Sequence, residues 1–180
     1  MGGADMKYAN TLETMLAKQD IADCLARYAR GVDRADAEML HSCYFDDSIE
    51  EHGSSYSGPA RAYIDGAMER MRASDVMGHY LCNLHVEFES DTLAYAECYV
   101  LTFARFAKQG EKWDTLTGGR IVDRFEKRDG EWRIAHRKIT LDWNRDMPMA
   151  EGWCLGLFKP EDPRMHIGEK GTGDLSYSRF

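Results

Sequence analysis

The sequence predicts an α+β fold in which three N-terminal helices pack on a strongly curved, mainly antiparallel sheet. Apolar residues recur with a helical period up to residue 73, and from residue 77 to 143 the period changes to that of strands. The extended stretches follow one another without an intervening helix, which is typical of an antiparallel meander. We expect such a sheet to wrap into an open cone whose mouth the helices close.

The first helix is expected to include residues 16–36 (LAKQDIADCLARYARGVDRAD), with Asn10 and Glu13 in a capping arrangement. Asp33 lies beside the apolar stripe, close to Gly31, a residue type that often marks a helix end. Its carboxylate is therefore either solvated or directed into the interior. The residues of the stripe are Leu12, Met15, Leu16, Ile21, Leu25, Tyr28 and Val32.

Two shorter helices are expected next. Residues 37–45 form one, with its apolar side chains inward, and residues 59–73 form the other, opened by Gly58-Pro59 because proline suits a first helical position. Residues 46–51 are expected to form a weak strand or turn, and residues 52–57 a loop.

Four long strands complete the predicted domain, and Asp129-Gly130 is a strong signal for a hairpin between the last two. The strands are expected at residues 77–89, 93–106, 115–127 and 132–143. We expect a disordered lead over residues 1–9 and one domain over residues 10–146. Residues 147–180 are expected to be a C-terminal extension lying over the domain or a neighbouring subunit.

Bulk composition excludes several classes of function. The formal charge of −8 argues against binding nucleic acid or an anionic membrane through a basic face. No run of 18 apolar residues suggests a membrane span, and the N-terminus has no apolar core typical of a secretory signal. Five widely spaced cysteines without a CxxC pair indicate reduced thiols, so we expect a cytoplasmic protein.

His79 is the candidate partner of Asp33. Imidazole is the side chain best suited to proton transfer near neutrality, and a carboxylate fixes its tautomer, so an Asp–His dyad that removes a proton in an apolar pocket is chemically sensible. Strict alternation, however, puts His79 on the more polar side of its strand. Either that face is semi-polar, or a bulge near Gly78 shifts the register.

Metal and cofactor motifs are absent from the sequence. No HExxH, Cys/His ligand spacing, GxGxxG, phosphate loop or GxSxG occurs, so we expect neither a metal nor a cofactor. The six histidines are scattered at His41, His52, His79, His85, His136 and His166.

The last strand places Arg137 in an otherwise apolar row with Ile139, Leu141 and Trp143. We expect these three apolar residues to contact the substrate. An arginine in such a row requires an anionic partner. That partner is either a structural carboxylate or the charge that develops on a leaving group or enolate.

Taken together, residues 19–143 resemble the SnoaL-like branch of the NTF2-like superfamily, a cone-shaped α+β barrel. The functional likeness is to the γ-hexachlorocyclohexane dehydrochlorinases and, more distantly, scytalone dehydratase. Order and spacing make the resemblance specific, and its pieces are GVDRADAEML, YFDDSIEEHG, YSGPARAY, HYLCNLHVEF, FEKRDGEWRIAHR and the closing DW.

The resemblance implies roles for individual residues. Asp33 matches the catalytic aspartate, His79 the histidine that takes the substrate proton, and Arg137 an arginine that assists the departing anion. Tyr28 and Tyr44 are expected in the pocket, although the dehydrochlorinase has a polar or basic residue where this chain has Tyr28.

The implied function is a cofactor-independent lyase of a small apolar, aromatic or cyclic molecule, working as a homodimer or homotrimer. The leaving group would be water, halide or formaldehyde, the last as in related lyases of aromatic-compound catabolism. The alternatives are an isomerase or cyclase, a non-catalytic β-type subunit of a ring-hydroxylating dioxygenase, and a small-ligand carrier. Hydrogen-bond reach between Asp33 and His79 would favour catalysis.

Overall fold

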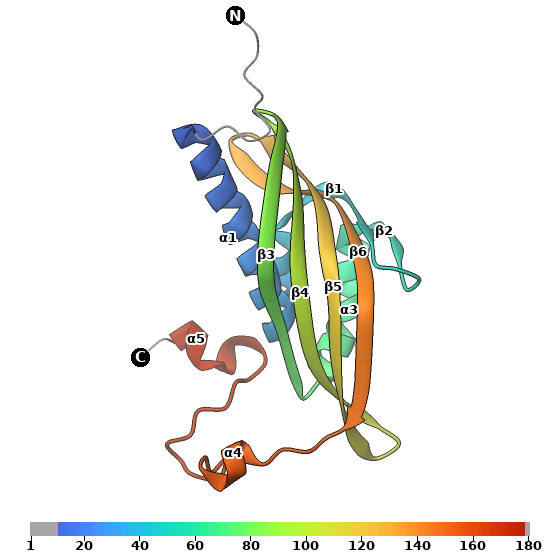
Figure 1. Cartoon of the computed structure of the whole chain (residues 1–180), viewed down its shortest axis with the longest axis vertical. Coiled ribbons are helices and arrows are strands. Elements are labelled where there is room, and N and C mark those ends of the chain that lie inside the picture. The colour runs from blue at the N-terminus through green and yellow to red at the C-terminus, as the bar shows by residue number, and fades with distance from the viewer. Residues whose placement is uncertain (1–10, 179–180) are drawn as a thin grey trace, which may run out of the picture.

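The computed structural model describes residues 11–178 and shows the predicted α+β fold, a long curved sheet with helices on one face (Figure 1). Six strands lie in the order β2-β1-β6-β5-β4-β3. Neighbouring strands are antiparallel, except that β1 pairs in parallel with β6. The strands are β1 (Tyr44–Glu51), β2 (Ser57–Pro59), β3 (Val76–Ser90), β4 (Leu93–Lys108), β5 (Glu111–Arg128) and β6 (Glu131–Pro148).

Helix α1 (Leu12–Arg34) lies across the sheet and supplies most of the contacts between the helices and β3. Thr11 and Thr14 cap its N-terminus reciprocally, side chain to backbone, while the expected cap residue Asn10 lies outside the described residues. The helix ends at Ala35, which adopts a left-handed conformation with φ of 52°. Asp33 therefore lies in the last helical turn.

The expected apolar stripe of α1 is wrong in its first turns. Leu12, Met15 and Leu16 are exposed, because the buried face passes instead through Thr14 and Ala17. From there the predicted stripe holds and continues through Ile21, Leu25, Tyr28 and Val32.

The second helix is shorter than expected. Helix α2 (Ala37–His41) stops before Tyr44, because the chain there pairs with β6 through a hydrogen bond from Ile134 N–H to the Cys43 carbonyl (2.9 Å). Helix α3 (Ala60–Ala73) forms as predicted, with Pro59 as its N-cap. The region expected to be a loop, residues 52–57, is a loop except for Ser57, which begins the short strand β2.

The C-terminal segment begins later than the sequence pattern suggested. Strand β6 continues to Pro148, since β5 offers ladder partners as far as the Trp113–Pro148 pair. The remaining chain contains the short elements α4 (Trp153–Gly156), η2 (Gly171–Gly173) and α5 (Leu175–Ser178). It turns back so that α5 lies near the C-terminal end of α1 (Figure 1).

Candidate active site

Asp33 and His79 form a hydrogen-bonded pair. The Nδ1 atom of His79 lies 2.8 Å from Asp33 Oδ1, and the backbone N–H of His79 donates to Oδ2 at 3.1 Å. An ionised carboxylate only accepts, so Nδ1 carries the proton and Nε2 is left to take a proton from a ligand. Only 15% of the His79 side chain and 18% of that of Asp33 are exposed, which keeps the pair sheltered but reachable.

A β-bulge explains how His79 reaches this position. The pairing of β3 with β4 gains one residue on β3 between Leu81 and Leu84, and the faces of the strand exchange there. Odd-numbered residues such as His79 face the helices before the bulge, whereas Val86 and Phe88 face the core after it. The register is regular at Gly78, so the bulge lies farther along than expected.

A cavity of about 240 Å³, here called the dyad cavity, opens beside His79. Three of the residues expected to contact the substrate, Tyr28, Ile139 and Leu141, line it. Its wall is largely apolar, with a few polar groups, as is usual for small-molecule sites. The other lining residues are His52, Val100, Thr102, Thr117, Gly119 and Ile121.

Arg137 lies in the core rather than among the residues lining the cavity. Its guanidinium is fully buried and donates to both carboxylate oxygens of Asp123, at 2.7 and 2.6 Å. Burial acts to lower the pKa of Arg137, but the Asp123 charge outweighs it and holds that pKa well above its usual range. The partner is thus the structural carboxylate, the first of the two alternatives left open by the sequence.

Arg137 still borders the site through an aromatic ring. Its guanidinium carbon lies 3.9 Å from the ring centroid of Tyr28, which forms part of the cavity wall. Burial raises the pKa of Tyr28 despite the opposing effect of Arg137, so the phenol presents a neutral hydroxyl.

Tyr44 and Trp143 do not line the dyad cavity. Tyr44 is buried, and its hydroxyl donates to Glu50 Oε2 at 3.0 Å. Trp143 lines a separate cavity of about 370 Å³ with Asp142, because β6 gains a residue where Gly118 pairs with Trp143 and Gly119 with Leu141. This bulge ends the alternation that grouped Trp143 with Leu141.

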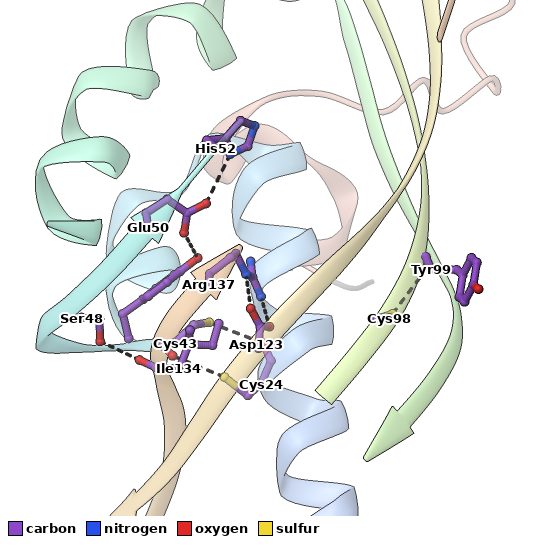
Figure 2. A network of polar contacts seen from close by, with 11 residues as sticks. Cys24, Cys43, Ser48, Glu50, His52, Cys98, Tyr99, Asp123, Ile134 and Arg137 are labelled. Carbon is purple, nitrogen blue, oxygen red and sulfur yellow. Dashed lines mark hydrogen bonds and ion pairs between the residues drawn. The ribbon is translucent and has the colours of Figure 1, made fainter. Parts of the chain in front are cut away.

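A second acid–histidine pair in the cavity wall was not predicted from the sequence. The His52 Nδ1 atom lies 3.2 Å from Glu50 Oε1, and Figure 2 shows the Glu50 carboxylate directed toward His52. Glu50 lies in β1 and His52 directly follows the end of that strand, so continued alternation over two residues would place both side chains on one face. That signal was missed because residues 52–57 were interpreted as a loop.

The C-terminal segment contacts the end of α1 that contains Asp33. Lys170 Nζ donates to the Asp33 carbonyl oxygen at 2.8 Å, and the Tyr177 hydroxyl donates to Asp36 Oδ2 at 2.6 Å. Arg34 and Asp174 add an ion pair at 3.2 Å. The segment thus buttresses the turn that presents the dyad.

Residues 11–178 contain neither a cluster of metal ligands nor a helix that could span a membrane. No cluster of three or more His, Cys, Asp or Glu side chains there could hold a metal ion. None of the helices in this range is long and apolar enough to span a membrane.

The curved sheet, the helices on one face and the cavity between them define an NTF2-like α+β cone. Residues 13–138 match the model of the SnoaL-like domain, and the chain belongs to that family. No protein with a curated description matches the chain in sequence.

Solved structures share the fold at low sequence identity. A candidate scytalone dehydratase from Novosphingobium aromaticivorans is 19% identical with a TM-score of 0.68, over 77% of this chain and 92% of that one. A type 2 hexachlorocyclohexane dehydrochlorinase is 19% identical with a TM-score of 0.69, over 84% and 98%. A type 3 dehydrochlorinase from Novosphingobium barchaimii is 19% identical with a TM-score of 0.68, over 77% and 94%.

Proposed function

We propose that this protein is a cofactor-independent lyase that eliminates a small leaving group from a small apolar, aromatic or cyclic molecule. The observation that supports this most directly is the 2.8 Å hydrogen bond between His79 Nδ1 and Asp33, at the wall of a largely apolar cavity. Two of the similar structures are named as dehydrochlorinases and one as a candidate dehydratase, which agrees with elimination chemistry.

In this mechanism Nε2 of His79 removes a proton from substrate carbon, and Asp33 stabilises the imidazolium that forms. The electron pair of the C–H bond becomes the new π bond as the leaving group departs. General-base catalysis of this kind contributes about 10²–10⁴-fold, so positioning and exclusion of water by the cavity must supply the rest.

The test is turnover by wild type, His79→Gln and Asp33→Asn, without added metal or cofactor. The panel comprises hydroxylated and halogenated cyclic compounds together with nitrobenzisoxazole, whose opening by base releases a coloured phenolate. We expect His79→Gln to lower kcat on the order of 10²-fold or more with an unchanged melting temperature. For the hydroxylated and halogenated compounds, product analysis separates elimination from isomerisation, because an isomer keeps all the atoms of the substrate.

His41→Gln is the matched control. His41 is also hydrogen-bonded to an aspartate, Asp65 at 2.9 Å, but it lies outside the dyad cavity. Its substitution should leave turnover unchanged. Full activity in His79→Gln, or no turnover of any panel member by wild type, would overturn the proposal.

A further inference from the structure

The Glu50–His52 pair has the geometry of a second proton-transfer group in the dyad cavity. His52 lines the same cavity as His79, and 30% of its side chain is exposed. Because the Glu50 carboxylate accepts at Nδ1, the proton on that nitrogen is fixed, and Nε2 is the nitrogen available for exchange.

Burial of Glu50 suggests that this pair has more than a packing role. The Glu50 side chain is fully buried, and a buried carboxylate is costly unless hydrogen bonds and an opposite charge compensate it. Arg137 donates to Asp123, whereas the side-chain contacts of Glu50 are with Tyr44 and His52. The Tyr44 hydroxyl supplies a hydrogen bond but no charge, whereas a protonated His52 would supply both.

Tyr63 of α3 holds the His52 ring from the other side. Its ring stacks on the imidazole with centroids 4.8 Å apart, and its hydroxyl lies 3.2 Å from Nε2. Burial raises the pKa of Tyr63 to about 12, which keeps the hydroxyl neutral. A neutral hydroxyl orients the imidazole and can give up its place near Nε2 to a ligand oxygen.

From these contacts we infer that His52 is the general acid of the elimination, protonating an oxygen leaving group while His79 acts as the base. The inference rests on the proposed function and narrows it. It assigns substrates whose leaving group departs as water, an alcohol or a phenol, because a departing halide needs no proton.

Two protons move during the elimination. Nε2 of His79 takes the proton from carbon, the C–H electron pair forms the π bond, and the bond to the leaving oxygen breaks with its pair on oxygen. The Nε2 proton of His52 moves to that oxygen. His79 ends protonated and His52 neutral, and solvent restores both before the next turnover.

A series of benzisoxazoles tests this directly, because ring substituents change the basicity of the phenolate leaving group while the abstracted proton stays the same. We expect His52→Gln to slow the unsubstituted compound on the order of 10²-fold and the nitro compound much less. His79→Gln should slow every member of the series, and His41→Gln none. Tyr63→Phe keeps the stacking ring but removes the hydroxyl contact with Nε2, so it should slow the unsubstituted compound less than His52→Gln does.

The outcomes separate the two proposals. Equal losses across the series in His52→Gln, or no loss at all, overturn the role of His52 and leave the dyad untouched. If His79→Gln keeps its activity both on the benzisoxazole series and on the substrate panel, the proposed lyase function itself is overturned.

A second readout needs no substrate. NMR nitrogen shifts of the imidazoles, assigned with His52→Gln, should show a proton on both Nδ1 and Nε2 of His52 in the free protein, and Glu50→Gln should change these shifts without moving those of His79. An Nε2 without a proton would overturn the inference even if no benzisoxazole were turned over.

Discussion

Asp123→Asn is expected to destabilise the fold strongly, because it leaves the Arg137 guanidinium charged and unpaired in the core. Asp123 and Arg137 are 1% and 0% exposed and are joined by two short hydrogen bonds. Removing one partner of a buried ion pair costs about 3–5 kcal/mol. For a chain of 180 residues each kcal/mol lowers Tm by about 2–4 °C, so the expected loss is on the order of 10 °C.

Urea titration and thermal scans of three variants measure this effect. The double variant Asp123→Leu/Arg137→Met removes both charges and should recover most of the lost stability, since apolar replacements of a buried pair are often neutral. Asp46→Asn is the control, because its carboxylate is 98% exposed and 3.5 Å from Arg61. A loss in Asp123→Asn no larger than in the control, or a double variant as unstable as the single one, would refute the reasoning.

The double variant also separates the two roles considered for Arg137. If the arginine is structural, turnover should survive in the double variant once stability is restored. If it assists the departing anion, turnover should fall although the fold is intact. Since Arg137 reaches the cavity wall only through Tyr28, we expect the first result.

Four further predictions follow from local geometry. Gly119→Ala should destabilise the protein by about 1–3 kcal/mol in urea titration, because the added Cβ would clash with the Thr140 carbonyl oxygen. Gly66→Ala, in open space on α3, should instead stabilise it by up to about 1 kcal/mol. Thr11→Ala removes the N-cap of α1 and should cost about 0.5–2 kcal/mol, measured in the same way. Hydrogen bonds from Ser176 and from the Glu169 N–H hold the pKa of Asp174 well below its usual range. The docking of the C-terminal segment on the end of α1 should therefore be fully stable above about pH 4, and it should weaken as the pH falls through the lowered pKa of Asp174. Limited proteolysis at a series of pH values measures this effect, and the Asp174→Asn variant should lose the dependence on pH.

The fold could be predicted because its signals are local. The change of period after α3 separates helices from strands, and Asp129-Gly130 forms the predicted hairpin turn with φ of 52° and 87° at the two residues. The order of the elements then leaves few ways to bury their apolar faces.

The direction of individual side chains could not be predicted to the same degree. The bulges in β3 and β6 each reverse the alternation; the sequence suggested one in β3 but near Gly78 rather than between Leu81 and Leu84, and the one in β6 was not predicted. His79 therefore reaches the dyad cavity against strict alternation, while Trp143 lines a different one.

The second acid–histidine pair depends on a contact that no local pattern reveals. In the parallel pairing of β1 with β6, Glu50 lies in register with Arg137, a residue 87 positions later in the chain. This pairing gathers Asp123, Arg137 and Glu50 in one buried cluster that meets the cavity at two places, through the Tyr28 ring and through His52. Neither Asp123 nor Arg137 lines the cavity itself. Effects of Asp123 or Arg137 substitutions on turnover must accordingly be judged against His52→Gln before either residue is assigned a direct chemical role.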